Sequence, residues 1–400
     1  MRLRTGFVAW ACALASAASA CHTATELVYV TGLVVQPADT TMQQGATVQL
    51  RASLVDTAGR PVLDVPASFV SSDSNTARVS PSGLVTSRGL VGAVVVTAAY
   101  SIFQAAARVR IVDSNVVASL PLPGRPFGIA VSSQGVVYVT GLDIAALARI
   151  DLPALVVSGS VTVGLAPTSV AFTSSGTTAL VANQLSSNVG VITVATNTQS
   201  STIALSGDPF IVRVSPDDKL LWVTTNVGGL YGIDLSTNGI VHTFSFATAA
   251  NGLAFHPSND SLLYASVTDG TVKEINFKRD VVLRTLSVGS EAQGVAVAPD
   301  ASELYVADQA GGRLQVVSLA SGAVASIALP GQPFDVQLSP DGTKLWVGVR
   351  TAGQVLVFNR STHALLRTIQ TGGAPRRIAF NQAGTIAVIA NEAGWVDFVK

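Results

Sequence analysis

The sequence predicts an all-β protein, most of which is a closed ring of seven similar β-sheets. Three observations predict this fold: a pattern that recurs seven times, four strand patterns in each copy, and two complementary ends of the repeated region. Successive copies begin 41 or 42 residues apart, a regularity that indicates one structural unit repeated. The copies begin at Pro126, Pro167, Pro209, Ala250, Ala292, Pro333 and Pro375.

Each copy contains four short strand patterns, which we name A to D in chain order. Residues 252–255 are an example of strand A, and a turn such as residues 339–342 (SPDG) follows it. Strand B carries a large residue such as Tyr264, and residues 355–358 and 365–369 are examples of strands C and D. Four short antiparallel strands in about 40 residues are typical of a β-propeller blade, whereas helical repeats would space apolar residues by three and four.

The two ends of the repeated region complement one another. The last copy stops at Lys400 after its strand C, residues 394–399, and so lacks a strand D. Residues 114–120 lie as far before Pro126 as a strand D lies before the first residue of the copy that follows it. We therefore expect a seven-bladed β-propeller over residues 114–400, in which strand 114–120 completes the last blade and protects its edge.

Two of the B strands carry a family resemblance. Residues 305–308 (YVAD) and 180–183 (LVAN) resemble the YVTN repeats of bacterial and archaeal surface propellers. The resemblance covers residues 114–400 and implies a propeller fold. It implies no single activity, because related propellers include surface-layer proteins, lactonases, lyases and haem carriers.

A second domain is expected at residues 27–113, where short strand patterns separated by turns indicate a small β-sandwich. These patterns lie at residues 27–30, 47–50, 62–65 and 94–97. Residues 69–86, with Gly45 and Gly92, resemble the core motif of the bacterial Ig-like group 2 domain. That resemblance implies a spacer or adhesion module on a cell-surface protein.

Residues 1–20 have the pattern of an export signal peptide. Arg2 and Arg4 precede an apolar run that ends in residues 18–20 (ASA), a small-residue cleavage site. This run is shorter than the roughly 20 residues of a membrane span, and turn residues interrupt every later apolar run.

Cys21 follows the predicted cleavage site and begins a tether, residues 21–26. Because Cys12 leaves with the signal peptide, Cys21 is the only thiol of the mature chain, and no disulfide within the chain is expected. Residues 18–21 resemble a lipobox, which implies lipidation of Cys21. Ala18 stands where that family usually has Leu, so ordinary cleavage at the same bond is the alternative.

Composition and motifs exclude several functions. The formal net charge is zero and 12% of the residues are charged, which argues against a nucleic-acid partner. Metal clusters, phosphate loops and nucleophile motifs are absent from the sequence, and no histidine is expected on the face that propellers use for ligands. We therefore expect no enzyme activity, no cofactor and no metal.

Ligands of propellers usually meet the face made by the D–A and B–C connections, which here carries scattered polar residues. The D–A connections offer Arg125, Asp208, Glu291, Gln332 and Arg376. The B–C connections offer Asp143, Asn183, Asn226, Asp269, Asp308, Arg350, Asn391 and Glu392. The alternative is an ordinary solvated loop surface.

The fourth residue after each copy's first residue is alanine in five copies, but Arg213 and Gln337 replace it in two. Small residues at this position are expected to let the blades crowd together. Arg213 and Gln337, with Asp335 and Arg377 nearby, could line a polar channel mouth and bind a ligand. Alternatively, they bond carbonyl groups or structural water between blades.

The sequence thus predicts an exported cell-envelope binding or scaffold protein, anchored at Cys21 at the cell surface or in the periplasm, whose propeller binds an envelope glycan, a peptide or a protein. One alternative is a lactonase-like hydrolase that holds a divalent ion on loop carboxylates. The candidate ion ligands are Asp143, Asp208, Asp269, Glu291 and Asp308. A structural surface-layer component is the other alternative.

Overall fold

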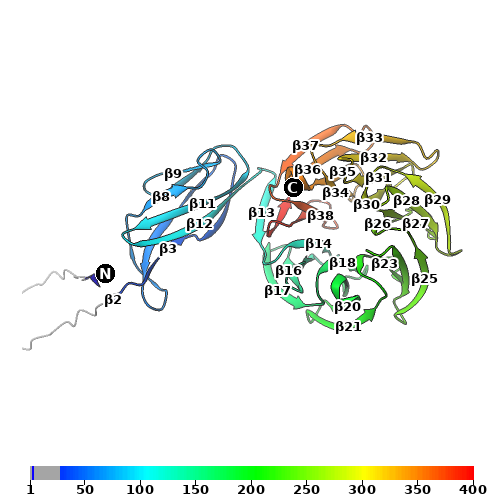
Figure 1. The fold of residues 1–400 in the computed structure, drawn as a ribbon, viewed down its shortest axis with the longest axis horizontal. Coiled ribbons are helices and arrows are strands. Elements are labelled where there is room, and N and C mark those ends of the chain that lie inside the picture. Colours follow the sequence, from blue (N-terminus) through cyan, green and yellow to red (C-terminus); the bar gives the residue numbers. More distant parts are fainter. Residues whose placement is uncertain (1, 4–27) are drawn as a thin grey trace, which may run out of the picture. The chain divides into compact units, whose positions relative to one another are not determined.

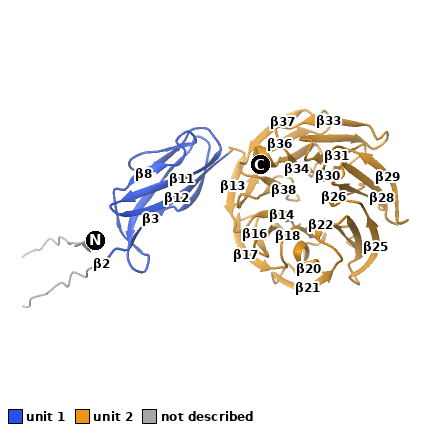
Figure 2. Cartoon of the chain, viewed as in Figure 1, with its two compact units in different colours: residues 1–112 blue, residues 113–400 orange. Residues whose placement is uncertain are grey.

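A computed structural model describes residues 2–3 and 28–400, which divide into two compact units, residues 1–112 and 113–400 (Figure 2). Most of the expected export signal and the whole expected tether, with Cys21, lie outside the described residues. β1 (Arg2–Leu3) pairs with β2 (Val28–Tyr29). In the described part of the chain, no helix is long and apolar enough to cross a membrane.

The first unit consists of short sheets around one apolar core. Its largest sheet has the order β4 (Asp39–Gln43), β12 (Phe103–Val112), β11 (Gly92–Tyr100), β8 (Ser68–Ser71), in which only the β4–β12 pair is parallel. The two smaller sheets are β3 (Gly32–Gln36), β6 (Arg51–Val55), β7 (Pro61–Asp64), and β5 (Thr47–Gln49), β10 (Leu84–Ser87), β9 (Ala77–Val79). Val94, Val96 and Val109 are fully buried, because alternate residues of β11 and β12 face the core.

Residues 113–400 fold into seven four-stranded antiparallel sheets arranged as a ring (Figure 1). Each innermost strand contacts the innermost strands of both neighbouring sheets, so the ring is closed. The sheets of blades 1 to 3 are β14 (Pro126–Val131), β15 (Val136–Gly141), β16 (Ala146–Asp151), β17 (Val156–Thr162); β18 (Pro167–Phe172), β19 (Thr178–Asn183), β20 (Asn188–Thr193), β21 (Thr198–Ala204); and β22 (Pro209–Val214), β23 (Leu220–Thr225), β24 (Gly229–Asp234), β25 (Gly239–Ser245).

The sheets of blades 4 to 6 are β26 (Ala250–Phe255), β27 (Leu262–Val267), β28 (Thr271–Asn276), β29 (Val281–Ser287); β30 (Ala292–Val297), β31 (Glu303–Asp308), β32 (Arg313–Ser318), β33 (Val324–Ala328); and β34 (Pro333–Leu338), β35 (Lys344–Val349), β36 (Gln354–Asn359), β37 (Leu365–Gln370). Two 3₁₀ turns, η1 (Gln184–Ser186) and η2 (Arg350–Ala352), lie in B–C connections. No α-helix occurs in residues 28–400. The all-β, seven-bladed propeller predicted from the sequence is confirmed.

The seventh blade joins the two ends of the unit. Its order is β13 (Val116–Pro121), β40 (Trp395–Val399), β39 (Ala387–Asn391), β38 (Pro375–Phe380). β13 runs antiparallel to β40, with Val116 opposite Val399 and Pro121 opposite Trp395. Hydrogen bonding between β13 and β40 therefore closes the ring, and the outer edge of β40 is not left unpaired.

Glycines on the innermost strands mark where neighbouring blades approach most closely. A Cβ atom added at Gly128 would lie 2.6 Å from the Thr168 carbonyl oxygen, and one at Gly294 would lie 2.8 Å from the Asp335 Cα. The crowded position is thus the second after each copy's first residue, and not the fourth as expected from the sequence. Most residues at the fourth position, Ala130 and Ala254 among them, line a cavity instead.

Candidate functional site

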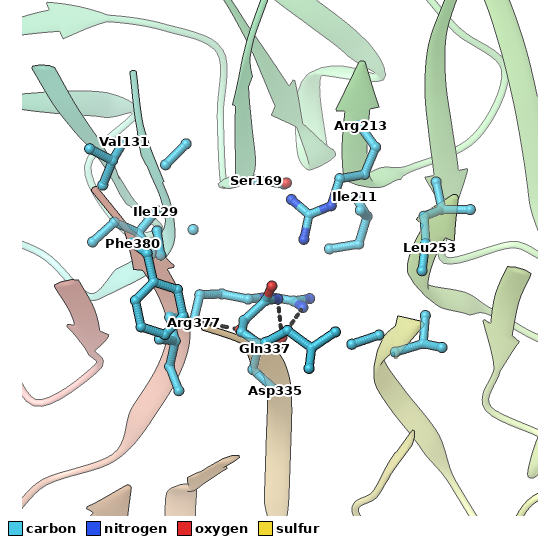
Figure 3. A pocket seen from close by; sticks show the side chains of 18 of the residues that line it. Ile129, Val131, Ser169, Ile211, Arg213, Leu253, Asp335, Gln337, Arg377 and Phe380 are labelled. Atoms are coloured by element: carbon cyan, nitrogen blue, oxygen red, sulfur yellow. Dashed lines mark hydrogen bonds and ion pairs between the residues drawn. The ribbon is translucent and has the colours of Figure 1, made fainter. Parts of the chain in front are cut away.

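The innermost strands of the propeller surround an axial channel that contains a cavity of about 410 Å³. Most of its wall is aliphatic. Five polar side chains interrupt this wall: Ser169 on β18, Arg213 on β22, Asp335 and Gln337 on β34, and Arg377 on β38 (Figure 3). They come from four different blades, and ring closure brings them together.

Asp335 is the only carboxylate in the wall of this cavity and is 1% exposed. One of its oxygens accepts hydrogen bonds from Gln337 Nε2 at 3.1 Å and Arg377 Nη1 at 3.4 Å. The other oxygen accepts the backbone N–H of Ile378 at 3.0 Å. Both oxygens of Asp335 are therefore occupied, and the residue joins blades 6 and 7.

Arg377 is 6% exposed and is held from two sides. Its second terminal nitrogen donates to the Asn251 carbonyl oxygen at 3.5 Å, and its guanidinium carbon lies 4.7 Å from the ring centre of Phe334. Burial lowers the pKa of Arg377 to about 10, although Asp335 opposes this shift. The side chain therefore remains a cation near neutral pH.

Arg213 differs from Arg377 because its side chain has no hydrogen bond or ion pair with any residue that the structure describes. Its side chain extends into the cavity toward Gln337 and Arg377 (Figure 3). Burial lowers the pKa of Arg213, and the charge of Asp335 partly offsets this effect. The cavity wall thus holds two cations and one anion.

A layer of phenylalanine side chains lies at the end of the channel nearest the D–A and B–C connections. Phe127 packs edge to face against Phe210 and Phe334, with ring centres 5.9 and 5.7 Å apart. All three are buried, and each directly follows the first residue of its copy. None of the three lines the cavity, whose wall begins with the residues that follow them on the inner strands.

Beyond this layer, three arginines surround Glu392 in the B–C turn of blade 7. The distances to its carboxylate oxygens are 2.9 Å from Arg376, 3.6 Å from Arg350 and 4.0 Å from Arg125. Arg125 also pairs with Asp143 at 3.0 Å. The cluster, named here the arginine cluster, contains three cations and two anions from blades 1, 6 and 7.

Arg376 connects the arginine cluster to the phenylalanine layer. Its guanidinium carbon lies 4.1 Å from the ring centre of Phe334 and 4.8 Å from that of Phe127. Burial lowers the pKa of Arg376, and the ion pair with Glu392 opposes this shift. Phe334 therefore has Arg376 and Arg377 as cationic neighbours, one from the cluster and one from the cavity.

A groove of about 660 Å³ begins beside Arg125 and Asp143 on the same face. Leu142, Ile144, Leu165 and Leu185 supply much of its wall. Leu165 and Leu185 are 58% and 67% exposed, which is unusual for leucine. We name this feature the leucine groove.

The structure gives other predicted residues of this face a local role. Asp308 is 2% exposed and accepts the N–H groups of Ser290, Glu291 and Gly311. Asn391 is fully buried and accepts the N–H groups of Ala374 and Ala393. Both were expected in B–C connections on the face used for ligands, but each is the last residue of a strand B and holds the adjoining connections together.

The remaining candidates lie apart from the arginine cluster. Asp269 accepts the N–H of Thr271 in its own turn, and Glu291 accepts Gln293 Nε2 at 3.0 Å. Asn226 donates its backbone N–H to the Asp208 carbonyl oxygen. In the described residues, no group of three or more His, Cys, Asp or Glu side chains is placed to hold a metal ion.

Comparisons with known proteins identify the fold. No protein-family model and no curated protein match the sequence. A solved chain described as Kuenenia stuttgartiensis hydrazine synthase superposes with a TM-score of 0.63 at 20% identity, covering 72% of this chain and 98% of that chain. A chain from a crystal structure of the mitotic checkpoint complex gives a TM-score of 0.65 at 16% identity, with 72% and 92% covered. At these identities the likeness extends to the fold alone.

Proposed function

We propose that this protein is an exported cell-envelope binding protein whose propeller binds a peptide or protein partner on the face of the D–A and B–C connections. The pattern of residues 1–20 supports export, and Cys21 supports a lipid anchor. The first unit serves as an Ig-like spacer, and the propeller is of the YVTN type. The resemblances of residues 69–86, 180–183 and 305–308 support these two assignments.

The observation that carries the proposal is the arginine cluster beside the leucine groove. Arg125 and Asp143 belong to both features, so charge and apolar surface adjoin each other. The cluster has one positive charge in excess, and Arg125 and Arg350 keep 49% and 34% of their side chains exposed. These exposed guanidinium groups can bind a carboxylate, and the groove can take an apolar side chain.

The partner segment that fits is therefore an acidic residue close to one or two aliphatic residues. Recognition of this kind combines a few polar contacts that orient the partner with apolar burial. The local roles of Asp269, Glu291 and Asp308 support binding over metal-assisted hydrolysis, because each carboxylate already accepts a hydrogen bond within its own blade or its connections.

Site-specific photocross-linking in the producing cells tests the proposal. A photoreactive residue at position 185, in the groove, should give a discrete cross-linked product, whereas one at Val241, exposed on the outer strand of blade 3, should not. Leu165→Asp and Arg350→Glu should each abolish the product from position 185. Arg279→Glu reverses a charge on an exposed turn and should not.

Equal products from positions 185 and 241, or a product insensitive to Leu165→Asp, would contradict the assigned face. A lactone-hydrolysis assay with added divalent ions tests the enzymatic alternative. Turnover that chelation abolishes and Glu291→Gln eliminates would overturn the assignment as a binding protein.

A further inference from the structure

The axial cavity carries an unbalanced charge that the fold itself does not require. Arg213 and Arg377 face one carboxylate, Asp335, and Arg377 takes the direct ion pair. Arg377 Nε also has no hydrogen-bond partner in residues 28–400. The cavity therefore offers guanidinium donors and one uncompensated positive charge.

Arg213 is unfavourable for folding in this position. A cation taken out of bulk water is costly unless it is paired, and Arg213 has no partner among the residues that the structure describes. Alanine occupies the equivalent position in five of the seven copies, so a blade can form without a long polar side chain there. A residue that violates the pattern of its own repeat at an energetic cost is most simply explained by a ligand.

The remainder of the cavity defines the kind of ligand. Ile129, Val131, Leu253, Val297 and Phe380 present apolar side chains to the same space. The phenylalanine layer lies at one end of this space, and the lining at the other end reaches the last residues of the inner strands, beside the A–B turns. A volume of about 410 Å³ is in the range of small-molecule sites.

We propose that the axial cavity is a binding site for a small organic monoanion, a carboxylate with an apolar body, whose head group pairs with Arg213. The guanidinium fork of Arg213 would bind both carboxylate oxygens, and Gln337 lines the same cavity (Figure 3). The apolar body would pack on the aliphatic wall. The cavity shares no lining residue with the arginine cluster or the leucine groove, so this site and the partner face proposed above can be tested independently.

Isothermal titration calorimetry of the mature full-length protein with hexanoate tests the site. Hexanoate should bind, whereas hexylamine, which has the same chain and the opposite charge, should not. Sodium chloride, added to the same ionic strength as the hexanoate solution, should not measurably reduce hexanoate binding. Because hydrogen bonds to charged groups are among the strong ones, Arg213→Gln should weaken hexanoate binding by at least about tenfold.

Two further variants complete the test. Arg279→Gln removes one positive charge from an exposed turn and should leave hexanoate binding unchanged. Ala254→Leu adds apolar volume to the cavity wall without touching its charges, so it should weaken binding even if Arg213→Gln fails to fold. The proposal is overturned if wild-type protein does not bind hexanoate, if hexylamine or chloride binds equally well, or if neither cavity variant weakens binding.

Discussion

The ion pair inside the channel gives the most direct test of how the ring is held together. Asp335→Ala removes the hydrogen bonds to Arg377, Gln337 and the Ile378 N–H in one step. Two of these three partners lie on β38 in the neighbouring blade. The substitution also leaves Arg213 and Arg377 in the cavity with no carboxylate beside them.

The expected loss of stability is large because both members of the pair are buried. Removing one partner of a buried ion pair typically costs about 3–5 kcal/mol. For a unit of roughly 290 residues, the unfolding entropy is on the order of 0.6 kcal/mol per degree. Asp335→Ala should therefore lower the Tm of the propeller by about 5–8 °C.

In a urea titration of the mature protein, tryptophan fluorescence reports on the unfolding of the propeller alone. Trp222, Trp346 and Trp395 are buried in the propeller, and residues 28–112 contain no tryptophan. The midpoint of unfolding should fall while the slope of free energy against urea is unchanged, because the surface exposed on unfolding is nearly the same.

Two controls separate the buried pair from a general effect of losing an aspartate. Asp260→Ala removes an exposed partner of Lys278 and should change stability by less than about 0.5 kcal/mol. In an Arg377→Met background, Asp335→Ala should cost clearly less than in the wild type, since the cation that pairs directly with Asp335 is already absent. A loss below about 1 kcal/mol in the wild-type background would refute the reasoning.

Four further predictions concern the cavity, the ring closure, a turn and the anchor. Arg213→Ala should stabilise the propeller by about 1–2 kcal/mol in the same urea assay, because it removes an unpaired cation from the cavity. The gain is smaller than for a cation without any water, because water in the cavity can hydrate the guanidinium group. Destabilisation would mean that Arg213 is a structural residue. Deleting residues 114–120 exposes the edge of β40 and should make the propeller aggregate and melt earlier, whereas deleting residues 22–110 should leave it folded; equal melting of the first variant and the intact protein would show another mode of closure. Hydrogen bonds from the Ser339 hydroxyl group and from Thr343 lower the pKa of Asp341 to about 2. The contribution of the Asp341 carboxylate to stability is therefore complete above about pH 4 and is lost as the pH falls toward 2. NMR titration should show this pKa, and Ser339→Ala should raise it. Cys21→Ser should release the protein from the detergent phase or stall its processing, and an unmodified Cys21 in a fully aqueous wild-type protein would exclude lipidation.

The sequence alone was sufficient to predict the propeller. Strands A to D of one blade pair with their neighbours along the chain, so the interactions that define a blade lie within one copy of about 40 residues. The strand that completes the last blade could be predicted for the same reason. Strand order within a blade follows chain order, and residues 114–120 lie where a strand D would lie before the first copy. Candidate residues such as Arg125, Arg350 and Arg213 could be named because they depart from the repeat or lie in its connections.

The tertiary structure alone decided which of these residues meet and which are buried. Arg213, Asp335 and Arg377 come from blades 3, 6 and 7, and Arg125, Arg350 and Glu392 come from blades 1, 6 and 7. Their proximity depends on how far each side chain reaches across a closed ring, which is not a property of any single repeat. Asp308 and Asn391 look like surface residues in the sequence, yet the structure buries them because the N–H groups of the adjoining connections need acceptors. A repeat pattern records the contacts within each blade, whereas the channel and the arginine cluster are made by contacts between blades.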